Sequence, residues 1–272
     1  MTPLPVIVTD LDATLLDHET YSWQPAAAAI ETIRGHGWPL VLNSSKTRAE
    51  IAALREELRN DDPFVVENGA AVYSPPGYFA KTGDAREAGL EVHRLGVDRA
   101  EIVKHVRRLR GERHLDLQGF ADWTPAEIAA RTGLSEEAAE RAAERCCSEP
   151  LVFDGDQAQL HWFQSELDRV GLDTAQGGRF LHVMGRCDKG AAVRWLRERY
   201  SEKFSDQDVR IIALGDSPND EEMLNAADVA VVIRSARSDQ LSVSQPSRVY
   251  RTSARGPAGW QEAMNELLPE FA

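Results

Sequence analysis

Two acidic residues close to the amino terminus have a spacing that suits phosphoryl chemistry. Asp10 and Asp12 follow an apolar run that ends at Thr9. Two carboxylates two residues apart can divide the work of catalysis, because one can attack as a nucleophile while the other acts as general acid and then as general base. The pair therefore predicts covalent acid/base chemistry at the end of a buried strand.

Three further polar groups in the sequence complete such a site. They are Ser44, Ser45 and Lys46 after a second apolar run, Lys189 at the start of a helical segment, and Asp216, Ser217, Asn219 and Asp220 in the sequence GDSPND. Asp216 can hold Mg²⁺ beside Asp10, since this ion prefers oxygen ligands. Ser44 and Lys189 can bind the negative charge that spreads over a phosphoryl group in the transition state. We therefore expect a Mg²⁺-dependent phosphatase in which water hydrolyses an aspartyl phosphate.

Each group taken alone also has a simple structural explanation. An acidic pair after a strand is usually a turn or a helix cap, and Ser44 and Ser45 could cap a helix that begins near Thr47. Lys189 alone could be a solvated surface lysine, and GDSPND has the composition of an ordinary loop. Their joint occurrence favours the functional interpretation, because every group follows a predicted strand or opens a predicted helix.

Alternating apolar and amphipathic segments predict how these groups are positioned. The segments are strands at 5–9, 39–43, 64–67, 209–214 and 229–233, and helices at 24–36, 47–58, 189–200, 220–226 and 256–268. This rhythm is typical of an α/β fold with a parallel sheet between helices, a Rossmann-like three-layer core that binds ligands at the carboxyl ends of its strands. Residues 81–187 combine charged helices with short strands, so we expect an inserted α+β domain there and a core formed by 1–80 and 188–272.

Composition limits the partners and the compartment. The 272 residues carry a formal net charge of −13, which argues against a nucleic acid or an anionic membrane as a partner. No apolar stretch approaches the roughly 20 residues that span a bilayer, and no basic segment precedes an apolar one at the amino terminus, so we expect a cytoplasmic protein. Both a monomer and a homodimer fit the sequence.

Taken together, the motifs resemble the haloacid dehalogenase superfamily of phosphatases. DLDATLLD is similar to the first motif of that family, Ser44 in LNSSKT to the second, Lys189 in DKGAAVRWL to the third and GDSPND to the fourth. The resemblance implies that Asp10 is the nucleophile and a Mg²⁺ ligand, and that Asp12 is the acid/base whose backbone carbonyl also binds the metal. The resemblance also implies that Asp216 is the second carboxylate ligand of the metal, and that Ser44 and Lys189 bind the phosphate.

Neighbours of these motif residues are expected to support them. Ser45 would bind phosphate beside Ser44, while Ser217, Asn219 and Asp220 would orient the lysine, water or metal. The family usually has glycine where this chain has Ala13. A residue with a negative φ would accept alanine at little cost, so we interpret Ala13 as a tolerated substitution that could affect the rate.

The long insertion resembles a type IIB cap, which selects the substrate in this family. SSKTRAE, ENGA, GGRFLHVMG and RGPAGWQEA are similar to segments of mannosyl-3-phosphoglycerate phosphatases. The resemblance implies that the substrate is a small phosphorylated glycoside, mannosyl-3-phosphoglycerate, which would be hydrolysed to mannosylglycerate and phosphate. A glucosyl-3-phosphoglycerate phosphatase, a broader sugar phosphatase and a catalytically weak protein that binds a phosphorylated ligand are the alternatives.

Candidate substrate contacts come from both regions of the chain. They are Lys46, Glu67, Asn68, Gly69, Arg179 and His182. The guanidinium of Arg179 would fit the additional carboxylate of a phosphoglyceryl glycoside, although it could equally be a surface arginine on a strand. We expect Trp123, in a helix-like segment, to pack in a core rather than to stack on a sugar.

Overall fold

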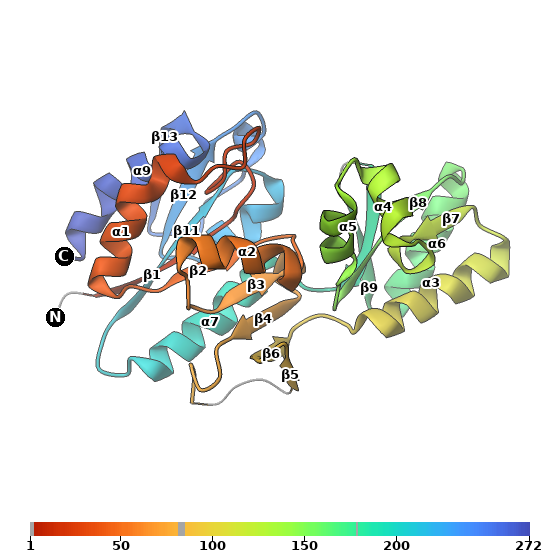
Figure 1. The fold of residues 1–272 in the computed structure, drawn as a ribbon, viewed down its shortest axis with the longest axis horizontal. Helices are drawn as coiled ribbons and strands as arrows, with labels where there is room; N and C mark the ends of the chain where they lie inside the picture. Colours follow the sequence, from red (N-terminus) through yellow and green to blue (C-terminus); the bar gives the residue numbers. More distant parts are fainter. Residues whose placement is uncertain (1–2, 81–84, 178) are drawn as a thin grey trace. The chain divides into compact units, whose positions relative to one another are not determined.

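The computed structural model describes residues 3–80, 85–177 and 179–272. Contacts divide the chain into two compact units. The first unit comprises Met1–Ser44, Asn60–His93 and Asp188–Ala272, and the second comprises Ser45–Arg59 and Arg94–Cys187. Figure 1 shows the fold, and each unit is described by itself. The sequence-based boundaries at 81 and 187, and the cap function of that range, stay a prediction.

The first unit contains a mostly parallel sheet. Its strands are β1 (Leu4–Thr9), β2 (Leu40–Asn43), β3 (Phe64–Val66), β4 (Ala71–Ser74), β5 (Ala85–Glu87), β6 (Leu90–Arg94), β11 (Val209–Gly215), β12 (Val229–Arg234) and β13 (Arg248–Arg255). Within the described residues their order is β13-β12-β11-β1-β2-β3-β4-β6-β5. The neighbours from β13 to β3 pair in parallel, whereas β3 with β4 and β5 with β6 pair antiparallel. This architecture confirms the predicted α/β class.

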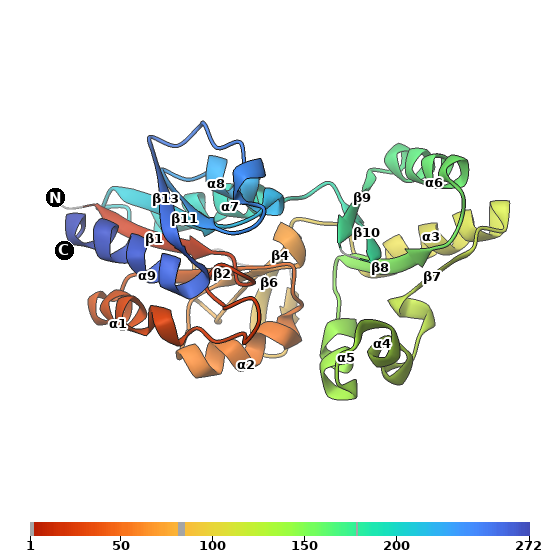
Figure 2. The ribbon, with the colours of Figure 1, turned by 90° about the horizontal axis from the view of Figure 1, so that it is seen from above.

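Helices cover both faces of this sheet. They are α1 (Ala27–His36), α7 (Lys189–Lys203), α8 (Glu221–Asn225) and α9 (Gly256–Leu267), with short 3₁₀ turns at Gln24–Ala26, Glu67–Gly69, Pro218–Asp220, Ser238–Gln240 and Leu268–Glu270. Figure 2 shows α1 and α9 on one face and α7 and α8 on the other. Trp260 of α9 is fully buried, and its indole N–H donates to the Thr9 hydroxyl at 3.1 Å. This hydrogen bond ties α9 to the last residue of β1.

The central strands are the apolar runs that the sequence predicted. Val6, Ile7 and Val8 of β1 have no exposed surface, as expected for a parallel strand that is covered on both faces. Thr9 of β1 lies opposite Leu214 of β11 and opposite Leu42 of β2. The residues that follow these three strands therefore meet at one carboxyl edge of the sheet.

The second unit contains a separate antiparallel sheet and five helices among its described residues. Its elements are α2 (Arg48–Leu58), α3 (Arg99–Arg113), β7 (Leu117–Gly119), a 3₁₀ turn (Phe120–Asp122), α4 (Pro125–Thr132), α5 (Glu136–Ala143), β8 (Ser148–Phe153), α6 (Gln157–Arg169), β9 (Leu172–Gly177) and β10 (Phe180–Gly185). The strand order is β7-β8-β10-β9. Figure 2 shows α3 and α6 on one face of this sheet and α4 and α5 on the other.

Each face of the second sheet has its own apolar cluster. Ile102 and Leu109 of α3 and Phe163 of α6 are fully buried against the strands. On the opposite face Phe120 and Ile128 form a smaller cluster, against which Trp123 packs while it stays partly exposed. Each helical layer of the second unit is therefore packed on the sheet through its own apolar cluster.

Two features of the first sheet were not anticipated from the sequence. β13 was not anticipated, because this edge strand carries Arg248, Arg251 and Arg255 and has no apolar run. β5 and β6 fall within the range 81–187 but lie at the edge of the first sheet. Within the residues that the structure describes, no helix has the length and apolarity needed to cross a membrane.

Candidate active site

A buried lysine joins two of the predicted acidic residues at the carboxyl edge of the first sheet. Lys189 begins α7, and its side chain is fully buried. Its Nζ donates to Asp10 Oδ1 and to Asp220 Oδ1, both at 2.6 Å. Asp10 follows β1 and Asp220 follows β11, so three segments far apart in sequence are held together. The burial of Lys189 excludes the alternative of a solvated surface residue.

The buried charges shift one another's ionisation. Burial raises the pKa of Asp10 to about 7, with Asp220 adding to the rise and Lys189 opposing it. Burial likewise raises the pKa of Asp216, and the charge of Asp220 adds to that rise. For Lys189, burial alone would lower the pKa, but the carboxylates of Asp10 and Asp220 outweigh it and raise the pKa. The lysine therefore stays charged, while the acids around it carry more negative charge than it can balance.

The GDSPND loop is tied together by Asp220. Its Oδ1 accepts from Lys189, and its Oδ2 accepts from the backbone N–H groups of Asp216 at 3.0 Å and Ser217 at 3.2 Å. Gly215 makes this possible, because a Cβ there would lie 2.5 Å from the Cβ of Asp220. Both oxygens of Asp220 thus bind the loop and the lysine. Asn219 is exposed, and its side-chain oxygen accepts from the Ser217 hydroxyl at 2.6 Å.

The donor set suits a hard divalent cation. Asp10, Asp216 and Asp220 each offer a carboxylate oxygen, and these oxygens lie within 4.8 Å of one another. All three residues are buried, and Lys189 is the cation beside them. Oxygen ligands and a surplus of buried negative charge are what Mg²⁺ prefers. Because both Asp220 oxygens are already used, Asp10 and Asp216 are the carboxylates best placed to bind a metal.

The loop that follows Asp10 contains an unexpected strained position. Asp12 is half-buried, and its backbone forms an isolated β-bridge with that of Leu16. Ala13 has a φ of 60°, in the left-handed region that favours glycine. The expectation of a cheap substitution at negative φ is therefore wrong, since alanine in this region costs about 1–2 kcal/mol. The strain lies immediately after the predicted acid/base.

Ser44 and the loop after β3 lie at the same edge. Ser44 is buried, and its carbonyl accepts from the Asn68 N–H at 2.9 Å. Glu67, Asn68 and Gly69 all have positive φ, at 50°, 59° and 96°. A Cβ on Gly69 would lie 2.0 Å from the carbonyl oxygen of Asp188, so only glycine allows this loop to touch the start of α7. The predicted sugar contacts of this loop stay a prediction, but its glycine clearly supports the position of Lys189.

The remaining predicted substrate residues belong to the second unit. Ser45 and Lys46 precede α2, where Thr47 is the N-cap, and the Ser45 carbonyl accepts from Arg145 at 3.1 Å. His182 is half-buried on β10, and Arg179 lies in the turn before it. All four residues therefore belong to the second unit, and their part in substrate binding stays a prediction.

Three polar contacts join the site to other segments of the chain, and two of them, from Thr14 and Ser235, had no clear sequence signal. The Thr14 hydroxyl donates to Asp216 Oδ1 at 3.3 Å, and the Ser235 hydroxyl donates to the Asp216 carbonyl at 2.9 Å. The Asn43 amide donates to the Lys189 carbonyl at 3.2 Å. Each of these residues orients a catalytic candidate from a distant segment, so only the folded chain reveals it.

Comparisons with known proteins agree with this geometry. Residues 7–83 match the family model described as haloacid dehalogenase-like hydrolase, and residues 157–267 match that of sucrose-6F-phosphate phosphohydrolase. A glucosyl-3-phosphoglycerate/mannosyl-3-phosphoglycerate phosphatase from Persephonella marina is 35% identical over 269 residues, which are 98% of each chain. The chain belongs to the haloacid dehalogenase-like hydrolases. Within them it is a phosphoric monoester hydrolase.

A second relative and one solved structure are also similar to this chain. A protein of the same printed name from Methanococcoides burtonii is 33% identical over 265 residues, which are 97% of each chain. A haloacid dehalogenase-like hydrolase of known structure from Bacteroides thetaiotaomicron is similar at a TM-score of 0.65 and 20% identity. The match covers 97% of this chain and 99% of that chain. At that identity the structural match supports the fold alone.

Proposed function

We propose that this haloacid dehalogenase-like hydrolase is a Mg²⁺-dependent phosphatase that releases phosphate from glucosyl- or mannosyl-3-phosphoglycerate through an aspartyl phosphate at Asp10. The observation that carries the proposal is the buried Lys189, which lies 2.6 Å from both Asp10 and Asp220. A nucleophilic carboxylate needs a fixed orientation, and a phosphoryl group needs fixed cations. Lys189 can meet both needs at once.

The residues of the chain divide the reaction between them. Lys189 holds Asp10 Oδ1, so Asp10 Oδ2 is the oxygen that attacks phosphorus. Asp12 protonates the oxygen of the leaving glycosyl glycerate and then takes a proton from the water that attacks the aspartyl phosphate. Ser44 and Lys189 donate to the phosphoryl oxygens. The loop bonds of Asp220 keep Lys189 and Asp216 in place throughout.

Metal binding belongs to the same proposal. Asp10 and Asp216 would hold Mg²⁺, together with the Asp12 carbonyl that the family resemblance implies. When bound, the ion would supply positive charge that stabilises the transferring phosphoryl group and favours the ionised form of Asp10. That second effect matters because a pKa of about 7 would otherwise leave much of Asp10 protonated near neutral pH.

The substrate proposal rests on the names of the relatives. Both relatives carry glucosyl-3-phosphoglycerate and mannosyl-3-phosphoglycerate in their printed names and are aligned over nearly their full length. We therefore propose both glycosides as substrates of this chain, within the broader class of phosphorylated glycosides. Other sugar phosphates, for which such names offer no support, should be hydrolysed more slowly.

The experiment is phosphate release by the purified chain from the two glycosides and from hexose phosphates, with Mg²⁺ and with a chelator. We expect the glycosides to be preferred and the chelator to stop turnover. Asp10→Asn should abolish release, whereas the matched control Asp206→Asn, at an exposed position before β11, should retain it. A peptide that contains Asp10 and carries one phosphoryl group after rapid quenching would support the covalent step.

Two results would contradict the proposal. Full activity of Asp10→Asn would exclude the nucleophile. Equal rates on all phosphate esters would exclude the substrate assignment while leaving the phosphatase chemistry intact.

A further inference from the structure

A cleft at the carboxyl edge of the first sheet is lined by basic side chains that the catalytic chemistry does not use. It encloses about 320 Å³ and is formed by the loop after β1, the end of β11, the loop after β12 and the junction of β13 with α9. Its arginines are Arg234, Arg237 and Arg255, and Ala13 and Asp216 connect it to the catalytic loops. All of these residues belong to the first unit.

The three arginines of this cleft are not neutralised by acids. Within the parts of the chain that the structure describes, none of them forms an ion pair with a carboxylate. Arg234 donates to a neutral group, the Ser253 carbonyl, at 3.2 Å. Arg248, at the other end of β13, pairs instead with Glu266 and Glu270. The cleft therefore keeps positive charge that no internal ion pair takes up.

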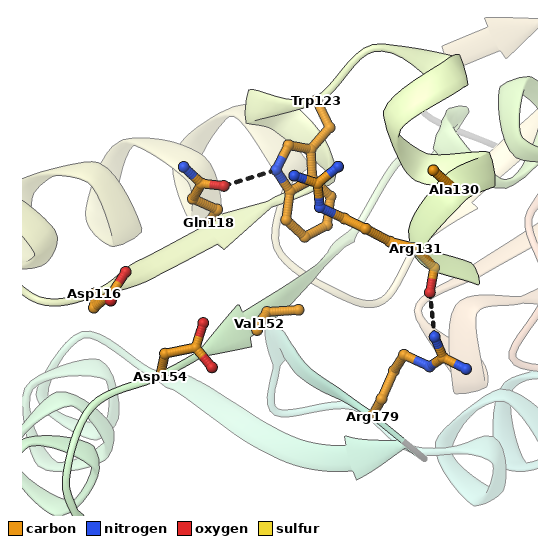
Figure 3. Close-up of a pocket in the computed structure, with 8 residues that line it drawn as sticks. All are labelled: Asp116, Gln118, Trp123, Ala130, Arg131, Val152, Asp154 and Arg179. Atoms are coloured by element: carbon orange, nitrogen blue, oxygen red, sulfur yellow. Dashed lines mark hydrogen bonds between the residues drawn. The ribbon is translucent and has the colours of Figure 1, made fainter. Parts of the chain in front are cut away.

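A larger cavity in the second unit, of about 450 Å³ around Trp123, lacks this property. The guanidinium carbon of Arg131 lies 4.4 Å from the centre of the Trp123 ring, and Arg131 also interacts electrostatically with Glu127. Figure 3 shows that Arg179 donates to the backbone carbonyl of Arg131. Both arginines of that cavity thus have partners, and two carboxylates line it as well. An anion has no preferred place there.

The acids beside the cleft leave the charge of its arginines available. Asp17 turns its carboxylate into its own loop, where Oδ1 accepts from the N–H groups of Glu19 and Thr20 and from the Thr20 hydroxyl. Asp216 would bind Mg²⁺ in the proposed mechanism, and the charge of the ion would outweigh that of the carboxylate. Glu19 is the remaining acid of the lining, and it is exposed.

The loop that carries Arg237 is fixed to the catalytic loop. The Ser235 hydroxyl donates to the Asp216 carbonyl at 2.9 Å and accepts from the Arg237 N–H at 3.0 Å. The buried Ser238 hydroxyl accepts from the Ser235 N–H and donates to the Ser235 carbonyl, both at 3.2 Å. A loop held in this way has less conformational freedom to lose when a ligand binds.

The start of α9 adds backbone donors to the arginines. Gly256, the first residue of this 12-residue helix, lines the cleft. Arg255 is the N-cap residue and, among the described residues, makes no side-chain hydrogen bond that caps the helix. The first turn of α9 contains no acidic residue. Its N–H groups therefore carry partial positive charge on the same side as the guanidiniums, which favours an anion.

This arrangement fits a tetrahedral oxyanion better than a carboxylate. The two oxygens of a carboxylate lie in one plane and are matched by one guanidinium through two parallel hydrogen bonds. Three guanidiniums and a helix start offer more donors, from several directions. The four oxygens of phosphate point in different directions, so phosphate can accept from several of these groups at once.

We propose that this cleft is a second oxyanion site, which binds inorganic phosphate through Arg237, Arg255 and the start of α9, while Arg234 adds positive charge. The choice of phosphate rests on the proposed function in one respect, because phosphate is the expected product. Asp216 is both a proposed metal ligand and part of the cleft lining. A phosphate that leaves the metal would therefore meet these arginines next.

The test is calorimetric titration of the full-length chain with inorganic phosphate and Mg²⁺, in the presence of beryllium fluoride, which mimics a phosphoryl group on an aspartate and fills the catalytic site. We expect one phosphate still to bind. Arg237→Gln and Arg255→Gln should each weaken this binding about tenfold or more, since each removes a charged hydrogen-bond donor. The matched control Arg251→Gln, at an exposed position of β13 outside the cleft, should leave the affinity unchanged. Unfolding midpoints of all three variants should match that of the parent chain, because the changed side chains are exposed.

The outcomes separate this inference from the proposed function. Absence of saturable phosphate binding by the parent chain, or unchanged affinity in both cleft variants, would overturn the oxyanion site. Tighter binding of glycerate than of phosphate would overturn the choice of ligand. Hydrolysis of p-nitrophenyl phosphate by the parent chain, abolished by Asp10→Asn, tests the catalytic chemistry without the cleft. A parent chain that lacks this hydrolysis would overturn the proposed function, while the comparison of the arginine variants would still decide the cleft.

Discussion

Ala13→Gly should stabilise the protein, although glycine usually does the opposite. Ala13 has a φ of 60°, a conformation that costs alanine about 1–2 kcal/mol and glycine almost nothing. Glycine also gives the unfolded chain more freedom, which removes about 0.4–1 kcal/mol of stability. At the middle of both ranges the difference leaves a net gain of about 0.8 kcal/mol in the free energy of unfolding, and the gain is at most about 1.6 kcal/mol. The assay is urea unfolding of both proteins under identical conditions.

Two matched substitutions test the reasoning behind that value. Ala28 is exposed in α1, where glycine should destabilise by about 0.5–1 kcal/mol. Ala88, in the turn between β5 and β6, has a φ of 48°, so glycine there should give a gain like that at Ala13. A lower urea midpoint for Ala13→Gly, together with a higher one for Ala88→Gly, would refute the strained backbone at the active-site loop.

The same variant measures what the strain means for catalysis. Ala13 already holds the backbone conformation that glycine would adopt, so the fold of the loop should not change. We expect phosphate release to change by no more than a few fold, and Ala88→Gly to leave it unaltered. A rise of several orders of magnitude in Ala13→Gly alone would instead favour the alternative of a catalytically weak, ligand-binding protein.

Three further outcomes follow from the buried site. Without metal, the pKa of Asp10 is about 7 in the folded chain, against 3.8 in the unfolded chain, so the stability that the protonated carboxyl contributes is lost as the pH rises from about 4 to about 7. Urea midpoints measured in chelator should fall over this pH range. In Asp10→Asn this fall should be absent. Lys189→Met should destabilise by about 3–5 kcal/mol at pH 8, because it leaves Asp10 and Asp220 buried without their cation, and by less at pH 5; equal losses at both values would contradict this. Gly69→Ala should destabilise by about 3 kcal/mol or more, since its Cβ would lie 2.0 Å from the Asp188 oxygen; an unchanged midpoint would show that the loops do not touch.

Local patterns made part of this structure predictable. The apolar run before Asp10 and the one before Asp216 have the length and composition of buried strands, and parallel strands bring their carboxyl ends to one edge. Lys189 was predictable for a similar reason, because a helix of the predicted fold begins at it. Each of these features is encoded by residues within about ten positions of the segment concerned.

The rest depended on contacts between distant segments. The double use of Asp220, the close approach of Gly69 to Asp188 and the positive φ of Ala13 follow from how loops meet, which no single segment encodes. The cavity around Trp123 is a similar case, since its lining comes from residues far apart in the chain. β13 escaped prediction because an edge strand needs no apolar run.

The three consecutive left-handed residues Glu67, Asn68 and Gly69 have a consequence for protein engineering. A search for thermostable variants would rank glycine favourably at the first two, because their backbone conformation disfavours side chains. The same loop reaches the start of α7, so gains in heat resistance there would be obtained beside Lys189, the lysine that we propose to bind the phosphoryl group. Libraries should therefore hold this loop constant and vary positions such as Ala88, where relief of backbone strain has no catalytic neighbour.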